Sequence, residues 1–186
     1  MSSRTKHRVL VADPAWPFKD QLPGKGRGAD KHYETMTIDE ICAFDLPKLH
    51  DDCWLFLWRP ATHAREALNV ARCWGFRRPP SELIWRKVTN DGSRIRIGMG
   101  RAFRNAHETC LVFRRGKPAR LSLSLPSVFD AARLEHSRKP DRFYEIVDEF
   151  APGPVVELFA RRQWRNWTCL GHEMQALEDG KENTSR

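Results

Sequence analysis

The sequence predicts an α/β domain, a layered structure in which helices pack on a β-sheet. Short apolar runs rich in β-branched and aromatic residues alternate with segments whose apolar residues recur at helical spacing, and this alternation is typical of the class. At 186 residues the chain has the length of one domain and can bury a sizeable core. Hydrophobic residues make up 40% of it and charged residues 30%, a composition that indicates a folded protein rather than a disordered one.

The first predicted element is a buried strand over residues 9–12, which ends abruptly at Asp13 and Pro14. Pro14 has no N–H to donate and therefore stops the ladder of hydrogen bonds. Asp13 is expected at the carboxyl end of the strand, where open α/β sheets have their ligand crevices. Trp16 follows and is expected to be an exposed flat surface beside that acceptor. From these residues alone, an ordinary Asp-Pro turn is the simpler interpretation.

The middle of the chain continues the alternation. Thr37–Glu40 has the form of a capping box and predicts a short helix that ends near Phe44. Residues 52–58 form a nearly continuous apolar run, which predicts a central strand buried on both faces. Apolar residues at helical spacing predict a helix over 64–74, and residues 81–85 predict the next strand.

The last third of the chain repeats the pattern. Residues 108–113 predict a strand, and a helix is expected from Pro140, because the fixed φ of proline suits a first helical turn. Residues 155–159 predict a further strand after a Pro-Gly-Pro break. The stretch 119–136 has no pattern that assigns it to an element. Residues 174–186 are polar, so we expect a single domain over 1–173 followed by a flexible tail over 174–186.

Two basic, glycine-containing stretches contribute to the net charge of +8 and are candidates for contact with a phosphate backbone. Residues 19–31 predict a mobile loop whose four basic side chains either contact phosphates or only keep the loop soluble. A second irregular stretch is expected to begin at Arg86 and Lys87 and to end near Ala106, a length that is uncommon unless functional. Its basic side chains predict contacts with a nucleic-acid backbone. They are Lys87, Arg94, Arg96, Arg101 and Arg104.

Several classes of protein are disfavoured by the sequence. The five cysteines lie singly, with no Cys-x-x-Cys pair, so neither a disulfide framework nor a zinc site is expected. There is no apolar run long enough to cross a membrane and no signal-peptide pattern at the start. We therefore expect a cytoplasmic protein that uses no metal, does not bind membranes and is a monomer or a homodimer.

Several separated segments resemble the motifs of one family. Asp13-Pro14-Ala15-Trp16 resembles the Asp-Pro-Pro-Trp signature of N6-adenine methyltransferases, with Ala15 in place of the second proline. The segments 32–36, 55–58, 84–87, 136–141 and 157–161 follow in the same order as in that family. Over roughly residues 8–173 the chain resembles the MT-A70 family, which includes the eukaryotic mRNA N6-adenosine methyltransferase and bacterial and phage DNA adenine methyltransferases.

The resemblance implies a fold, a cofactor and a set of site residues. The fold is a Rossmann-like methyltransferase fold in permuted motif order, with a mixed, mostly parallel sheet and helices on both faces. The cofactor is S-adenosylmethionine. The implied catalytic residues are Asp13, Pro14 and Trp16, and Tyr33 joins the basic residues in binding substrate. The implied cofactor-binding residues are Asp13, Lys139, Glu157, Phe159, Arg161, His172 and Glu173.

The implied reaction is methylation of the N6 amino group of adenine. This nitrogen is a poor nucleophile, because its lone pair is delocalised into the ring. The Asp13 carboxylate and the Pro14 carbonyl can accept its hydrogens, while Trp16 and Tyr33 stack on the base. The small size resembles bacterial and phage members and favours DNA as substrate. Three alternatives remain open: an RNA adenosine N6-methyltransferase, an inactive nucleic-acid-binding partner subunit, and a basic domain that binds another nucleotide.

Overall fold

One sheet organises the part of the chain that the computed structural model describes, residues 6–17, 35–100, 102–122, 124–134 and 138–171. Its strands are β1 (His7–Ala12), β2 (Leu49–Arg59), β3 (Ser81–Val88), β4 (His107–Arg115), β5 (Val128–Ala132), β6 (Val155–Leu158) and β7 (Thr168–Leu170). Across the sheet their order is β5-β3-β4-β2-β1-β6-β7.

Strand β1 lies inside the sheet, between β2 and β6. It pairs in parallel with β2 on one side and with β6 on the other. The pairs β3–β5 and β6–β7 are also parallel, and β4 is antiparallel to both of its neighbours. The predicted mixed, mostly parallel sheet is therefore confirmed. The strand that leads into Asp13 comes first in the chain, whereas its neighbour β6 comes near the end, as expected for a permuted motif order.

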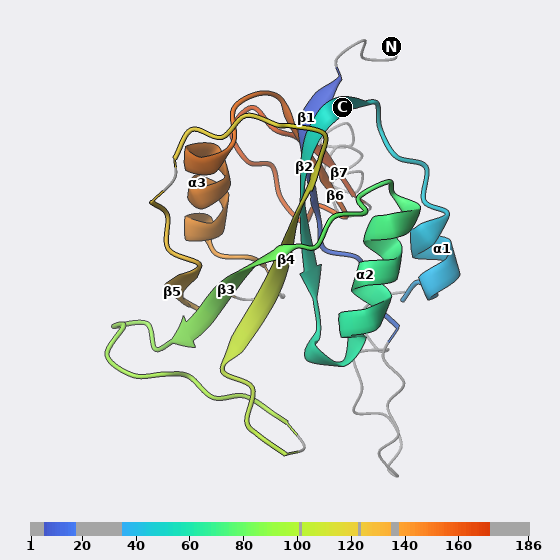
Figure 1. Ribbon diagram of the computed structural model, residues 1–186. Helices are drawn as coiled ribbons and strands as arrows, with labels where there is room; N and C mark the ends of the chain where they lie inside the picture. The colour runs from blue at the N-terminus through green and yellow to red at the C-terminus, as the bar shows by residue number, and fades with distance from the viewer. Residues whose placement is uncertain (1–5, 18–34, 101, 123, 135–137, 172–186) are drawn as a thin grey trace, which may run out of the picture.

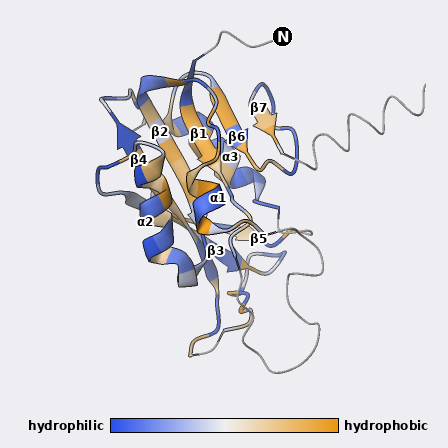
Figure 2. Cartoon of the chain, turned by 90° about the vertical axis from the view of Figure 1, so that its right-hand side faces the viewer, coloured by the Kyte–Doolittle hydropathy of each residue, from blue (hydrophilic) through white to orange (hydrophobic). Residues whose placement is uncertain are grey.

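Helices cover both faces of the sheet, as predicted. On one face lie α1 (Ile38–Cys42) and α2 (Ala64–Cys73), and on the other lies α3 (Asp141–Phe150) (Figure 1). Successive side chains of a strand point to opposite faces, so Leu10 joins the core under α1 and α2 while Val11 joins the core under α3. The central strands β1, β2 and β6 are accordingly apolar along much of their length (Figure 2). This two-sided burial explains the continuous apolar runs in the sequence.

The local signals in the first half of the chain are largely confirmed. The capping box forms, because the Glu40 N–H donates to Thr37 Oγ1 at 3.2 Å and the Thr37 N–H donates to Glu40 Oε2 at 2.7 Å. The helix it begins ends at Cys42, slightly before the predicted Phe44. A short 3₁₀ turn, Ala61–His63, leads into α2.

The predictions for β3 and for the two edge strands were wrong or incomplete. Strand β3 continues to Val88, so Lys87 lies within a strand and not at the start of an irregular stretch. The patternless region 119–136 contains β5, and a three-residue strand, β7, was also missed. The missed strands lie at the two ends of the sheet order, where one side of each strand has no neighbour among the described residues. Short edge strands need few apolar residues and leave little periodicity in the sequence.

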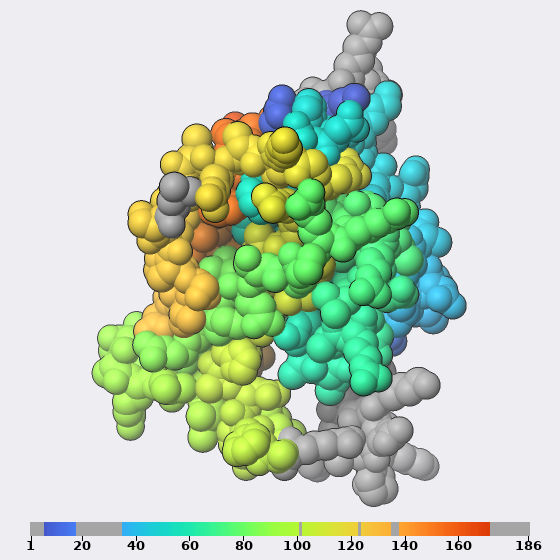
Figure 3. All heavy atoms as spheres, in the orientation of Figure 1, coloured from blue at the N-terminus to red at the C-terminus, as the bar shows by residue number. Residues whose placement is uncertain are grey.

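Residues 89–106, here called the arm, connect β3 to β4. The arm is tied to the sheet at its base, because the Arg96 N–H donates to the Lys87 carbonyl at 2.8 Å. Farther out, the Gly98 N–H donates to the Asn105 carbonyl at 2.7 Å. The arm extends away from the body of the domain (Figures 1 and 3). Strand β3 is parallel to β1, so the arm begins at the same edge of the sheet as Asp13.

Candidate active site

The candidate site lies at the edge of the sheet where the parallel strands end. Ala12 pairs with Leu57 of β2 and with Leu158 of β6, so all three strands end near Asp13. The antiparallel strand β4 begins at this edge, because Thr109 pairs with Arg59. A cavity of about 510 Å³ opens here, with Asp13, Pro14 and Trp58 in its lining. Cavities of this size hold small ligands.

The turn after β1 is held by backbone contacts on both sides. The Trp16 N–H donates to the Pro14 carbonyl at 2.8 Å, and the Met36 N–H donates to the Ala15 carbonyl at 2.8 Å. The Pro14 carbonyl keeps a second lone pair that can accept another hydrogen. These contacts hold the Asp13-Pro14 segment against the cavity even though Ala15 replaces the second proline.

The expectation that Trp16 is exposed was wrong. Its side chain belongs to the core under α1 and α2 and is only 3% exposed. The indole N–H donates to the Trp58 carbonyl at 3.0 Å, and the ring lies beside His63, with 5.6 Å between ring centroids. A large aromatic ring that can also satisfy its N–H is better buried than exposed. Trp16 is therefore mainly a core residue that supports the turn, although it also contributes to the lining of the active-site cavity.

Asp13 takes part in a network of four charged side chains. Lys139 Nζ lies 2.8 Å from Asp13 Oδ2 and 3.0 Å from Glu108 Oε2. Glu108 Oε1 lies 2.7 Å from Lys87 Nζ. The Lys139 ammonium also sits over the ring of Trp58, 4.8 Å from its centroid. Two carboxylates and two ammonium groups thus come together from separate parts of the fold. Asp13 follows β1, Lys87 lies on β3, Glu108 lies on β4, and Lys139 lies just before α3.

Burial and charge act in opposite directions on this network. Burial would lower the pKa of Lys139, but the carboxylates of Asp13 and Glu108 raise it above its ordinary value. For Glu108, burial would raise the pKa, yet the positive charges of Lys139 and Lys87 lower it to about 2. Both groups are therefore ionised at neutral pH. The network is a preorganised electrostatic environment next to the cavity.

Glu157 is a third acid near Asp13, and its surroundings differ from those of Glu108. It lies on β6, is 4% exposed and accepts a hydrogen bond from the Tyr144 hydroxyl at 3.1 Å. Burial raises its pKa to about 7, and the charge of Asp13 adds to the rise, although the Tyr144 hydrogen bond opposes it. Arg162 stacks over Tyr144 with its guanidinium carbon 4.4 Å from the ring centroid.

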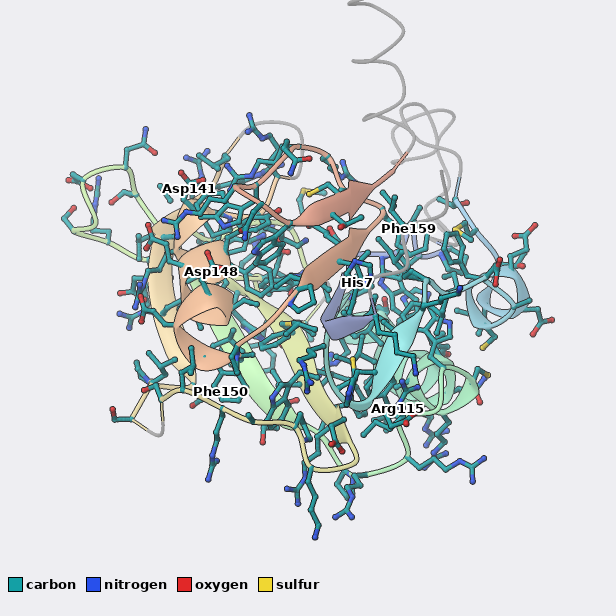
Figure 4. The ribbon with its side chains drawn as sticks, turned by 90° about the horizontal axis from the view of Figure 1, so that it is seen from above. His7, Arg115, Asp141, Asp148, Phe150 and Phe159 are labelled. Atoms are coloured by element: carbon teal, nitrogen blue, oxygen red, sulfur yellow. The ribbon has the colours of Figure 1, made fainter. Side chains whose placement is uncertain are left out.

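The loop after β6 is fixed to α3 by indole hydrogen bonds. Trp164 Nε1 and Trp167 Nε1 donate to the two oxygens of Asp148 at 3.1 and 2.8 Å. Seen from above, Asp141 and Asp148 lie along α3 on one side of the sheet, with α2 on the other side (Figure 4). Phe159, the first residue after β6, has a positive φ of 61°, a conformation that non-glycine residues rarely adopt outside functional or tightly constrained turns.

The residues present fit the S-adenosylmethionine implied by the resemblance. Asp13, Lys139, Glu157, Phe159 and Arg161 line one pocket, which at about 10 Å³ is too small to hold a ligand by itself. Asp13, Lys139 and Arg161 also line the cavity of about 510 Å³, which has the size for such a ligand. Carboxylates suit the ammonium and ribose hydroxyls of such a ligand, and cations suit its carboxylate. In the described part of the chain, Arg162 also has a buried Nε and Nη2 without a hydrogen-bond partner.

Comparisons with known proteins agree with this geometry. A sequence model of the MT-A70 family matches residues 7–173. The chain belongs to the MT-A70 family. Within that family it is 34% identical over 180 residues to the N(6)-adenosine-methyltransferase catalytic subunit METTL3 of Homo sapiens. The aligned region covers 92% of this chain and 29% of the human protein.

Other relatives include both long and short proteins. The N(6)-adenosine-methyltransferase MT-A70-like protein of Drosophila melanogaster is 33% identical over 177 residues, or 92% of this chain and 28% of the fly protein. The type II methyltransferase M.MunI of Mycoplasma sp is 26% identical over 191 residues, or 92% of this chain and 79% of that enzyme. The chain thus spans less than a third of the length of the eukaryotic MT-A70 relatives.

The structure separates the predicted substrate-binding residues of this MT-A70 domain. Lys87 lines the active-site cavity and is paired with Glu108. Arg94, Arg96 and Arg104 are exposed on the arm and do not line that cavity. Arg101 and Tyr33 lie outside the described residues, as do His172, Glu173, the loop 19–31 and the tail 174–186.

Glu108 and Trp58 were missed by sequence reasoning. Glu108 was predicted only as the start of a strand over residues 108–113, and it reaches the site because β4 is antiparallel and begins beside Asp13. Trp58 was read as core, yet it also lines the cavity, and its buried Nε1 has no partner among the described residues. Neither residue carried a local signal, because strand direction and pairing decided their positions.

Two negative findings concern the described residues alone. None of their helices combines the length and the apolar character needed to span a bilayer. No group of three or more of their histidine, cysteine, aspartate or glutamate side chains is arranged to hold a metal ion.

The pH dependence of folding should reveal the buried carboxyl of Glu157. Between its ordinary pKa of 4.5 and about 7, the folded protein keeps a proton that the unfolded chain has lost. The free energy of unfolding must therefore fall as pH rises through this interval, by up to about 3 kcal/mol. Urea unfolding at pH 4.5 to 7.5 should show this slope in the wild type and a flatter curve in Glu157→Gln. The exposed Asp51→Asn should follow the wild type, and equal slopes in all three would contradict the prediction.

Proposed function

We propose that this protein transfers a methyl group from S-adenosylmethionine to the N6 amino group of adenine in nucleic acid, with DNA as the favoured substrate. The observation that carries the proposal is the Asp13-Pro14 turn at the cavity. It holds a carboxylate and a carbonyl beside a space of about 510 Å³, with Lys139 fixing Asp13 at 2.8 Å.

The chemistry follows from these two acceptors. When bound, S-adenosylmethionine supplies an electrophilic methyl group on a positively charged sulfur. The Asp13 carboxylate and the Pro14 carbonyl accept the two N6 hydrogens, which favours a nitrogen whose lone pair points at that methyl group. As the new N–C bond forms and the methyl–sulfur bond breaks, with its electron pair staying on the sulfur, the nitrogen becomes positive. The Asp13 carboxylate stabilises this charge until one N6 proton leaves to solvent. Positioning of the two reactants supplies a large share of the acceleration.

The preference for DNA rests on one relative and on charge. The chain aligns over 92% of its length with the type II methyltransferase M.MunI, at 26% identity. The net charge of +8 and the exposed arginines of the arm suit a phosphate backbone. An RNA substrate is the second candidate, favoured by the higher identity of 34% to an N(6)-adenosine-methyltransferase catalytic subunit.

The inactive-partner alternative is disfavoured by the intact Asp13 network. A subunit that only scaffolds another chain has no need for a carboxylate held by a lysine that is itself 10% exposed. Burying charged groups costs free energy unless they are paired, so such a network is expensive to build without a use.

The test is methyl transfer by the purified chain. Labelled S-adenosylmethionine is incubated with single- and double-stranded DNA and with RNA, each containing adenine, and with matched strands in which N6-methyladenine replaces adenine. We expect label in adenine-containing DNA and none in the premethylated strands. Label only in RNA would replace the DNA proposal with the RNA candidate. An absence of label from every substrate would overturn the catalytic proposal.

A further inference from the structure

A second cavity of about 300 Å³ adjoins the active-site cavity. The two share Lys87, Asn105 and Glu108 in their linings. One wall of this second cavity, here called the side groove, comes from the arm. The other wall comes from Arg133 and Leu134, which follow β5, and from Arg138. A ligand in the active-site cavity would therefore reach the side groove across a shared wall.

The side groove has a strong excess of positive charge. Arg96, Arg133 and Arg138 line it together with Lys87, against one acid, Glu108. Glu108 is already paired with Lys87 and Lys139. Within the described part of the chain, no acid forms an ion pair with any of the three arginines, and all three are exposed. Their charges are therefore available to an anionic ligand.

Neighbouring arginines behave differently. Arg86, on the adjoining part of β3, makes a two-pronged contact with Asp130. Arg142 is paired with Glu145 and Glu149. Among the described residues, carboxylates also pair with Arg59, Arg162 and Arg165. Arg96, Arg133 and Arg138 have no such partner there, and they converge on the side groove from the arm and from the connection between β5 and α3. Several guanidinium groups that converge on one place form a suitable binding site for a phosphate group.

The side groove also has an apolar component. Ile97 and Met99 are 64% and 78% exposed, and both belong to its lining with Leu134 and the buried Trp85. Exposed large apolar side chains next to unpaired arginines suit a nucleobase and its phosphate. Bases stack on apolar and guanidinium surfaces, while the backbone binds the charge.

We infer that the side groove binds the nucleotide next to the methylated adenine in a single strand or a locally opened duplex. Arg133 and Arg138 hold its phosphate, and Ile97 and Met99 contact its base. The inference rests on the proposed function for the identity of the neighbouring cavity. It adds a subsite outside the catalytic turn and assigns roles to Arg133 and Arg138.

The test measures binding without any methyl donor. Fluorescein-labelled single-stranded DNA of ten nucleotides with one central adenine is titrated with the protein, and fluorescence anisotropy is recorded from 50 to 300 mM salt. The double variant Arg133→Ala/Arg138→Ala should raise the Kd at least about tenfold. It should also lower the salt slope by about 0.7 for each lost phosphate contact. The control is Arg77→Ala/Arg78→Ala, two exposed arginines that precede β3 at the opposite edge of the sheet.

Trimmed strands identify the subsite. Oligonucleotides that end at the adenine on the 5′ or the 3′ side lack one neighbour each. The wild type should lose affinity for one of the two, and the Arg133/Arg138 variant should show no further loss on the same trimming. Equal losses in the two double variants, or a trimming effect that the Arg133/Arg138 variant retains in full, would overturn the inference. Because no transfer is measured, an inactive but groove-binding protein would refute the proposed function alone.

Discussion

Replacing Asp13 with asparagine should lower the rate of methyl transfer by about 10³-fold while leaving affinity for nucleic acid within threefold of the wild type. Asparagine keeps one carbonyl oxygen near the N6 hydrogens but lacks the negative charge that stabilises the nitrogen as it becomes positive. Loss of a preorganised electrostatic partner of this kind has a cost of about 10²- to 10³-fold, and the loss of a full charge belongs at the upper end. The measurement is single-turnover transfer of labelled methyl groups to the preferred substrate.

The fold of the variant should survive, which makes the result interpretable. Lys139 retains Glu108 at 3.0 Å when the charge at position 13 is removed, and Asp13 is not a core residue, with 20% of its side chain exposed. The matched control is Asp45→Asn, an exposed acid in the connection between α1 and β2, which should transfer methyl groups at the wild-type rate. A rate for Asp13→Asn within tenfold of the wild type would remove Asp13 from the proposed mechanism.

The sequence was informative where local chemistry decides structure. The capping box at Thr37, the apolar run of β2 and the apolar face of α3 each predicted an element at nearly the right residues, because each depends on neighbours within a few positions. Residues that required long-range pairing were poorly predicted. Strand β5 has partners about 44 residues earlier in the chain, as Ile84 pairs with Val128, and its own five residues carry little periodicity.

The candidate site shows the same division. Asp13 was predicted as a candidate because a strand end followed by proline is visible in the sequence, and Lys139 was predicted only from the resemblance. Glu108 was missed because its role depends on the antiparallel direction of β4, which no local pattern specifies. Trp16 was wrongly expected to be exposed, because the sequence does not show that the Trp58 carbonyl is available to its N–H. Local patterns therefore predicted individual candidate residues, and the sheet topology determined which of those residues lie together in the site.

Lys139 pairs with both Asp13 and Glu108. Its replacement by methionine should therefore destabilise the domain. Methionine is similar in length but leaves Asp13 and Glu108 without their shared cation. Breaking a buried ion pair on one side costs about 3–5 kcal/mol. Because 20% and 31% of the two acidic side chains remain exposed to water, we expect a smaller loss, about 2 kcal/mol at pH 7. Urea unfolding followed by circular dichroism measures it.

The pH dependence of that loss separates a charge effect from a packing effect. Lys139 and Lys87 lower the pKa of Glu108 from 4.5 to about 2, so the stabilisation is present above pH 4.5 and is lost as the pH falls toward 2. The difference between the wild type and Lys139→Met should therefore shrink over this interval. A constant difference would mean that methionine simply packs poorly against the Trp58 ring.

Two further variants complete the comparison. Lys87→Met removes a cation that pairs with Glu108 alone, so it should cost less than Lys139→Met and leave Asp13 held. Adding Glu108→Gln to Lys139→Met removes one of the two carboxylates that have lost their shared cation. The double variant should recover part of the lost stability, because an unpaired buried carboxylate is costlier than a neutral amide. If Glu108→Gln instead deepened the loss, the link between Lys139 and Glu108 would not be the source of the stabilisation, and Asp13 would be its main partner.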